Sequence, residues 1–132
     1  MADGPEKRVE NKIKTNLEKL GAYYLKNFAG PNTAKGHPDI TAVSSKNRGK
    51  LWAIEVKKPI GGKPTTIQIE RLCLIAQNGG RSVITADPLT PQYLAGELDR
   101  PVDKIKIKQA LRDKETIWTK RTKGTEIVEI IK

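Results

Sequence analysis

Two carboxylates and one ammonium mark the ends of two short apolar stretches. Asp39 follows a Gly-x-Pro turn in GHPD, and Glu55 and Lys57 are separated by one valine in LWAIEVK. Side chains alternate between the two faces of a strand, so Glu55 and Lys57 share a face. If the strand after Asp39 pairs with this one, Asp39 comes close to Glu55. Adjacent carboxylates repel each other unless a cation lies between them.

Divalent-metal chemistry is one use for such a cluster. Mg²⁺ prefers oxygen ligands and keeps several waters, and Asp39, Glu55 and the Val56 carbonyl would supply half of that shell. Lys57 would direct its ammonium to the same place, toward an attacking water or the charge that builds on a phosphate. The alternative is a pair of solvated strand ends, in which Glu55 and Lys57 form an ordinary surface ion pair.

Two segments have the apolar periodicity of helices. The first covers residues 5–21, with Pro5 suited to its first turn and Gly21 as its stop. The second covers residues 65–80. The apolar faces of the two helices consist of Val9, Ile13, Leu17 and Leu20, and of Ile69, Leu72, Cys73 and Ala76. We therefore expect Cys73 to pack in the core as a small apolar residue.

Short apolar runs bounded by Gly, Pro and Asn predict strands over residues 22–28, 39–43, 51–57 and 81–86. A hairpin-like turn joins the second to the third. The order is helix, three strands, helix and strand, which predicts an α/β fold with a mixed sheet flanked by helices.

The segment after residue 88 has weaker patterns. We expect a short helix over residues 91–98, a second helix over 102–114 and a β-hairpin over 115–132 around Lys123-Gly124. A lone hairpin is marginal in water, so its apolar residues must pack on the same domain or meet a second copy of the chain.

The charge balance favours a polyanionic partner. The chain has 25 Lys and Arg against 15 Asp and Glu, which gives a net charge of +10 at pH 7. Neutralising phosphates releases counterions, so such a protein binds nucleic acid without sequence contacts. Aromatic residues make up only 5% of the chain, which does not suggest a platform that stacks single-stranded bases.

Length and composition exclude several other classes. The 132 residues suit one domain, and no apolar run approaches the length of a membrane span. The N-terminus lacks the apolar region of a signal peptide. The single cysteine, Cys73, excludes an internal disulfide and a cysteine-rich zinc site. We expect a cytoplasmic protein with no membrane partner.

The motif order resembles the VRR-NUC domains of the PD-(D/E)XK, restriction-endonuclease-like nuclease superfamily, in particular the small stand-alone members of phages. The matching elements are Glu10 in the leading helix, GHPD, AIEVKKP, GGKPTTIQ and Gln68. The resemblance covers roughly residues 6–86. It implies a restriction-endonuclease-like core over residues 1–87, with residues 88–132 as a C-terminal extension.

The resemblance also implies roles for residues. Asp39, Glu55 and the Val56 carbonyl would be metal ligands for Mg²⁺, with Mn²⁺ as a substitute. Lys57 would be the catalytic lysine, and Glu10 would assist with metal or water from the first helix. Lysines in the loops beside the motif are candidates for contacts to the DNA backbone: Lys35, Lys58 and Lys63.

Two of these residues have simpler explanations. Glu10 lies one step off the apolar face of a charged helix, so it could be an ordinary surface carboxylate. In TTIQ, Thr65 and Gln68 form a capping box that explains Gln68 without chemistry. A contact of Gln68 with the active site and a capping role could coexist.

Three functions remain open on the sequence. The first is a metal-dependent DNA endonuclease that selects branched or four-way-junction DNA, acting as a homodimer as the resemblance implies. The second is a restriction-like nuclease that recognises duplex sequence. The third is a non-catalytic nucleic-acid-binding protein on the same fold, although a pure binder gains nothing from carboxylates that face phosphates.

Overall fold

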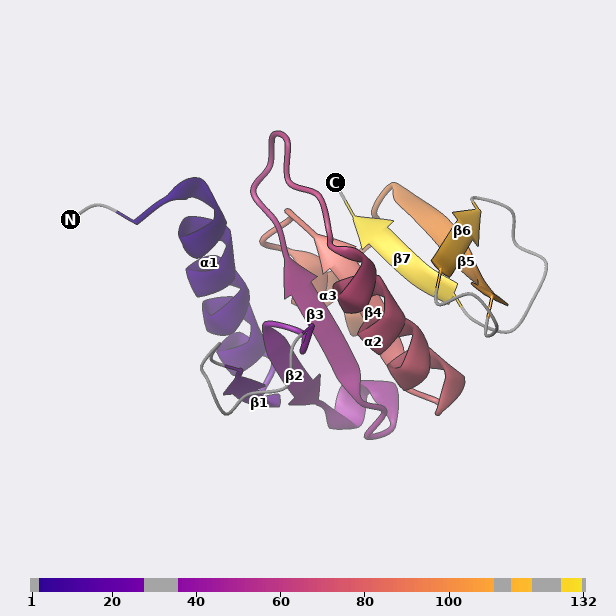
Figure 1. Cartoon of the computed structure of the whole chain (residues 1–132). Helices are drawn as coiled ribbons and strands as arrows, with labels where there is room; N and C mark the ends of the chain where they lie inside the picture. Colours follow the sequence, from indigo (N-terminus) through magenta and orange to yellow (C-terminus); the bar gives the residue numbers. More distant parts are fainter. Residues whose placement is uncertain (1–2, 28–35, 111–114, 120–126, 132) are drawn as a thin grey trace.

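The computed structural model describes residues 3–27, 36–110, 115–119 and 127–131. In these residues a seven-stranded sheet has the strand order β1-β2-β3-β4-β7-β5-β6 (Figure 1). The elements are α1 (Pro5–Lys19), β1 (Tyr23–Lys26), β2 (Ile40–Val43), η1 (Ser45–Asn47), β3 (Trp52–Val56), α2 (Thr66–Gln77), β4 (Arg81–Thr85), α3 (Thr90–Leu94), β5 (Val102–Ala110), β6 (Glu115–Thr119) and β7 (Ile127–Ile131). No helix among the described residues is long and apolar enough to cross a membrane.

The sheet is mixed, as the sequence predicts. Strands β1, β2 and β3 are antiparallel neighbours, and β3, β4 and β7 run parallel. The predicted order of helix, three strands, helix and strand is confirmed by α1 through β4, and the short helix α3 lies inside the predicted range of 91–98 except for its first residue.

Two predictions for the C-terminal segment are wrong. Residues 102–110 form strand β5 and not a helix. The predicted hairpin is also absent, because β6 pairs with β5 while β7 lies between β4 and β5. The alternation Lys-Ile-Lys-Ile-Lys over residues 104–108 has the period of two that is typical of a strand. The position of β7 depends on a pairing with β4, more than 40 residues earlier, which no local pattern contains.

Each face of the sheet has its own hydrophobic core. On one face α1 packs against β2 and β3, and α3 lies beside α1 (Figure 1). This core contains Val9, Ile13, Leu17, Ile40, Ala42, Trp52, Ile54, Val56, Val83, Leu94 and Ile131. On the other face α2 covers a smaller core of Ala53, Ile69, Leu72, Cys73, Ile84 and Val128. The predicted burial of Cys73 is confirmed.

Close backbone contacts place the turn before β2. Gly36 has a φ of +78°, and a Cβ at this position would lie 2.8 Å from the carbonyl oxygen of Ile67 in the first turn of α2. The neighbouring chain fixes the other side, because Asn27 donates from its backbone amide to Asp39 O at 2.8 Å and from its side chain to Pro38 O at 2.8 Å. The start of β2 is therefore held against both β1 and α2.

The C-terminal segment continues the same sheet and core. Glu129 of β7 accepts two hydrogen bonds from Arg81 of β4, at 2.7 and 3.1 Å, and one from the hydroxyl of Tyr93 at 2.6 Å. Hydrogen bonds to both Glu129 oxygens satisfy a carboxylate that would otherwise be costly to bury. These contacts join β4, β7 and the end of α3.

We predict that Ile131→Ala lowers the free energy of unfolding by about 2–5 kcal/mol, because it leaves a cavity in a well-packed core. Ile131 is 1% exposed and belongs to the α1-side core. Denaturant unfolding of the full chain measures the change. The matched control is Ile60→Ala, at a position 87% exposed, which should change stability by less than about 0.5 kcal/mol. Equal effects of the two substitutions would contradict a structural role for β7.

Candidate metal centre

The end of β3 and the start of β2 bring two carboxylates together. Ile40 pairs with Ile54 and Thr41 with Ala53, so one step further along this register Asp39 lies opposite Glu55. Directly opposite residues of antiparallel strands have neighbouring side chains. Asp39 Oδ2 also accepts a hydrogen bond from the Val56 amide at 2.8 Å. The predicted proximity of Asp39 and Glu55 therefore follows from the strand pairing.

Glu55 is nearly inaccessible to solvent, and its two oxygens have different surroundings. It is 2% exposed. Gln68 Nε2 donates to Oε1 at 3.1 Å, and Lys57 Nζ lies 3.4 Å from the same oxygen. Oε2 is buried and has no hydrogen-bond partner among the residues that the structure describes. Glu55 can form a hydrogen bond with Asp39 when a proton is shared between them; when both are ionised, this oxygen is available to a cation.

The pKa of Glu55 is raised to about 8: burial contributes most, and the negative charge of Asp39 raises the pKa by more than the Lys57 ammonium lowers it. In the absence of a cation, Glu55 therefore favours its protonated form at neutral pH. A divalent ion between the two carboxylates would remove the repulsion that holds this proton.

The side chains of Lys57 and Gln68 are hydrogen-bonded to each other on the α2 face of the sheet. Lys57 Nζ donates to Gln68 Oε1 at 2.9 Å. The predicted capping box is also present, since Thr65 accepts from the Gln68 amide and its own amide donates to Gln68 Oε1 at 2.9 Å. One side chain therefore both begins α2 and orients the lysine and carboxylate of the centre, so the two explanations for Gln68 are compatible.

Glu10 lies on the opposite side of the sheet from Glu55 and is connected to Asp39 through Lys26. It is buried on α1, which packs on the face of β3 that carries Val56, whereas Glu55 alternates onto the face covered by α2. Glu10 Oε2 accepts from Lys7 Nζ at 2.6 Å and lies 3.5 Å from Lys14 Nζ. Oε1 accepts from Lys26 Nζ. Burial raises the pKa of Glu10, but hydrogen bonds from Lys26 and Lys7 outweigh it and hold the pKa at about 2.

Lys26 lies beside the centre, although the sequence did not predict it as a site residue. Its Nζ contacts Glu10 Oε1 and lies 3.5 Å from Asp39 Oδ1. It ends β1 where the antiparallel strand β2 begins, with Lys26 paired to Ile40. Antiparallel pairing of these two strands would have predicted that Lys26 lies beside Asp39. The contact of Lys26 with Glu10 was not predictable in this way, because it depends on the docking of α1.

The residues present suit a divalent cation held mainly by water and two carboxylates. The hard oxygen donors are those of Asp39 and Glu55, and the buried, unpartnered Glu55 Oε2 is the clearest ligand atom. Among the described residues no group of three or more His, Cys, Asp or Glu side chains could hold a metal ion, which agrees with the separation of Glu10. The group of Val56 shown to face Asp39 is its amide; the role of its carbonyl stays a prediction.

The predicted DNA-contacting lysines lie in different situations. Lys58 and Lys63 are exposed in the loop between β3 and α2, directly after Lys57. This loop turns tightly, since a Cβ at Gly62 would lie 2.9 Å from the Lys57 Cβ. Lys35 lies outside the described residues, and its role stays a prediction.

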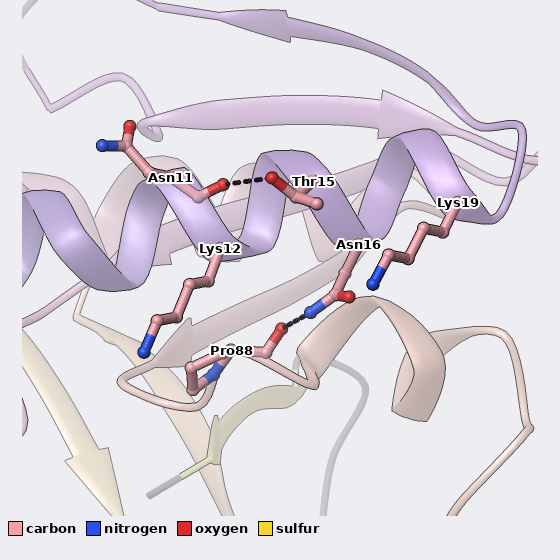
Figure 2. Close-up of a pocket in the computed structure, with 6 residues that line it drawn as sticks. All are labelled: Asn11, Lys12, Thr15, Asn16, Lys19 and Pro88. Atoms are coloured by element: carbon pink, nitrogen blue, oxygen red, sulfur yellow. Dashed lines mark hydrogen bonds between the residues drawn. The ribbon is translucent and has the colours of Figure 1, made fainter.

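A separate hollow of about 270 Å³ lies between α1 and the turn at Pro88 (Figure 2). Asn16 closes one side of it by donating to Pro88 O at 2.7 Å, and the side chains of Lys12 and Lys19 extend over it. The residues that line this hollow include none of the predicted site residues. It joins α1 to the turn after β4 and is not part of the carboxylate centre.

No family model matches this chain, and no curated protein matches it. Among solved structures, one described as a VRR_NUC domain is similar, with a TM-score of 0.59 and 24% sequence identity over 74% of this chain and 100% of that chain. This likeness confirms the fold that the motif order predicts. The chain has the α/β fold of a VRR_NUC domain, and the paired carboxylates lie at adjacent strand ends of that fold.

We predict that the metal-free protein loses stability with rising pH because of Glu55, and that Glu55→Gln does not. The folded pKa of about 8 lies above the ordinary value of 4.5, so folding favours the protonated form. The stabilising contribution is complete below pH 4.5 and is lost as the pH rises through about 8. Thermal unfolding in EDTA from pH 5 to pH 9 should show a midpoint difference between Glu55→Gln and the unmodified chain that grows with pH.

The control for this experiment is Glu6→Gln, which removes an exposed carboxylate from α1. Its midpoint difference should stay flat over the same pH range. A flat difference for Glu55→Gln as well would show that the buried carboxylate is already ionised at low pH.

Proposed function

We propose that this chain is a divalent-metal-dependent DNA endonuclease that hydrolyses phosphodiester bonds. The observation that supports the proposal best is a buried glutamate, Glu55, that has one unpartnered oxygen among the described residues and lies beside Asp39 and Lys57, on the fold of a VRR_NUC domain. Mg²⁺ is the proposed cation, and Mn²⁺ should replace it.

In this proposal Asp39 and Glu55 hold the cation, which when bound activates a water and offsets charge on the phosphate. The Val56 amide keeps Asp39 in place through its 2.8 Å hydrogen bond. Lys57 directs its ammonium at the same place and stabilises the charge that develops on a phosphate oxygen. Gln68 fixes the positions of Lys57 and Glu55 through bonds of 2.9 and 3.1 Å, which limits the geometry in which they meet a substrate.

The basic surface supports a DNA substrate. A net charge of +10 attracts the phosphate backbone without reading sequence. Lys58 and Lys63 are exposed on the loop that follows β3 (Figure 1), and we propose that they contact the DNA backbone beside the carboxylates. Contacts to the backbone favour recognition of DNA shape, and we propose branched DNA, including four-way junctions, as the substrate and a homodimer in the cytoplasm as the acting species.

A non-catalytic DNA-binding protein is the alternative of a different class. The carboxylate pair counts against it, because burying Glu55 beside Asp39 costs stability and repels phosphate. A restriction-like nuclease that recognises duplex sequence would use the same centre and differs only in its substrate.

We predict cleavage of labelled DNA by the full chain with Mg²⁺ or Mn²⁺ and none with EDTA, and faster cleavage of four-way junctions or flaps than of duplex. Asp39→Asn and Glu55→Gln should abolish cleavage, while DNA affinity stays equal or rises because a negative charge near the phosphate is removed. Gel analysis of cleavage and fluorescence anisotropy of binding measure both effects. Binding without cleavage under every metal condition would favour the non-catalytic alternative.

We predict that Lys57→Ala lowers the cleavage rate of the bound complex by about 10²–10³-fold, since it removes a preorganised donor of positive charge. DNA affinity should change much less. Lys63→Ala provides the contrast: it should weaken binding and reduce the salt dependence of log K by about one. Single-turnover kinetics separate rate from affinity, and a Lys57→Ala variant that loses affinity alone would reduce Lys57 to a phosphate contact.

A further inference from the structure

Glu55 and Glu10, the carboxylates on either side of Asp39, differ in the positive charge that already lies beside them. Glu55 has a buried oxygen with no hydrogen-bond partner among the described residues. Glu10 has lysines on both oxygens: Lys7 and Lys14 on Oε2, and Lys26 on Oε1. A cation therefore finds an available ligand atom beside Asp39 on the Glu55 side, but meets an ammonium on the Glu10 side.

Lys26 occupies the space between Glu10 and Asp39. Its Nζ contacts Glu10 Oε1 and lies 3.5 Å from Asp39 Oδ1, and its side chain is only 17% exposed. Two carboxylates that would otherwise repel each other share this one ammonium. A second divalent ion at the same place would have to displace the ammonium or approach it against strong repulsion in a poorly solvated site.

The position of Lys26 is fixed by secondary structure on both sides. The pairing of Lys26 with Ile40 and the bond from the Asn27 amide to Asp39 O, at 2.8 Å, set its distance from Asp39. The packing of α1 on the same face of the sheet sets its distance from Glu10. The ammonium is therefore preorganised in the site.

We propose that Lys26 is an internal cation that takes the place of a second metal ion, so that the centre binds one divalent ion, between Asp39 and Glu55. Glu10 then acts as the anchor of Lys26 and not as a metal ligand. This inference rests on the proposed function, because it assumes that the Asp39 and Glu55 pair binds a divalent cation. It makes Lys26 and Glu10 positioning residues for that centre.

The stoichiometry of Mn²⁺ binding tests the proposal. Isothermal titration of the full chain with Mn²⁺, checked by the electron paramagnetic resonance signal of free Mn²⁺, should give one ion for the unmodified protein. Lys26→Gln should give two, because removal of the ammonium leaves Glu10 and Asp39 facing each other. Lys26→Arg should give one, since it keeps the charge.

Two further variants separate this effect from a general change in charge. Lys12→Gln removes an exposed lysine from the outer side of α1 and should leave one ion. The double variant Glu10→Gln/Lys26→Gln should return from two ions to one, because the second ion needs the Glu10 carboxylate.

Glu10→Gln alone gives an independent measure of whether Glu10 is a ligand. Under the proposal it leaves one ion and changes the Mn²⁺ dissociation constant by less than about threefold. If Glu10 is a ligand, Glu10→Gln removes a charged oxygen donor from the ion and should weaken Mn²⁺ binding by about tenfold or more. That result would overturn the proposal even if Lys26→Gln failed to fold.

The outcomes distinguish the inference from the function on which it rests. Two ions in the unmodified protein, or one ion in a folded Lys26→Gln variant, would overturn the role of Lys26 while leaving a metal-dependent nuclease intact. No Mn²⁺ binding by the unmodified protein, or binding that Asp39→Asn and Glu55→Gln do not affect, would overturn the metal centre itself. Circular dichroism of each variant establishes that it is folded.

Discussion

Glu55 is a carboxylate buried next to a second carboxylate, and the polar contacts around it reduce the cost of this placement. Gln68 donates a hydrogen bond to one oxygen at 3.1 Å, the Lys57 ammonium lies 3.4 Å from the same oxygen, and the Val56 amide donates to Asp39. The second oxygen of Glu55 receives nothing from the described residues. A fold selected for stability alone would not retain such a group, because an apolar residue of similar size would cost less to bury. A cation that binds this second oxygen of Glu55 would explain why the carboxylate is kept at a buried position.

The sheet makes this placement possible because the centre lies where strands of opposite direction meet. The pairing of β2 with β3 is antiparallel and brings Asp39 beside Glu55, whereas β3, β4 and β7 are parallel and buried by helices on both faces. The Lys57 amide donates to Thr85 O at 2.8 Å, which extends the β3–β4 pairing past Glu55 to Lys57. The C-terminal strand β7 thus supports the centre from two strands away, by holding β4 in a two-sided core.

The sequence predicts the parts of this structure that depend on local patterns. Helical periodicity identifies α1 and α2, and the alternation in LWAIEVK places Glu55 and Lys57 on one face. The insertion of β7 between β4 and β5 was not predictable in this way, because strand pairs distant in sequence leave no local signature. For Glu10, the lysines at i−3 and i+4 were visible in the helix sequence, but its contact with Lys26 forms only when α1 docks beside β1.

The chain is basic overall, but its candidate metal centre is acidic, and lysines lie next to the acidic residues. Three ammoniums surround Glu10 on the α1 side, and Lys57 accompanies Glu55 on the α2 side. Lysines therefore lie beside the carboxylates on both faces of the sheet. In the proposed function, the net positive charge of the chain attracts a polyanion, and the carboxylates of the centre attract a cation. If the chain acts as the proposed nuclease, this distribution of charge would help to bring a phosphate and a metal ion to the same strand ends.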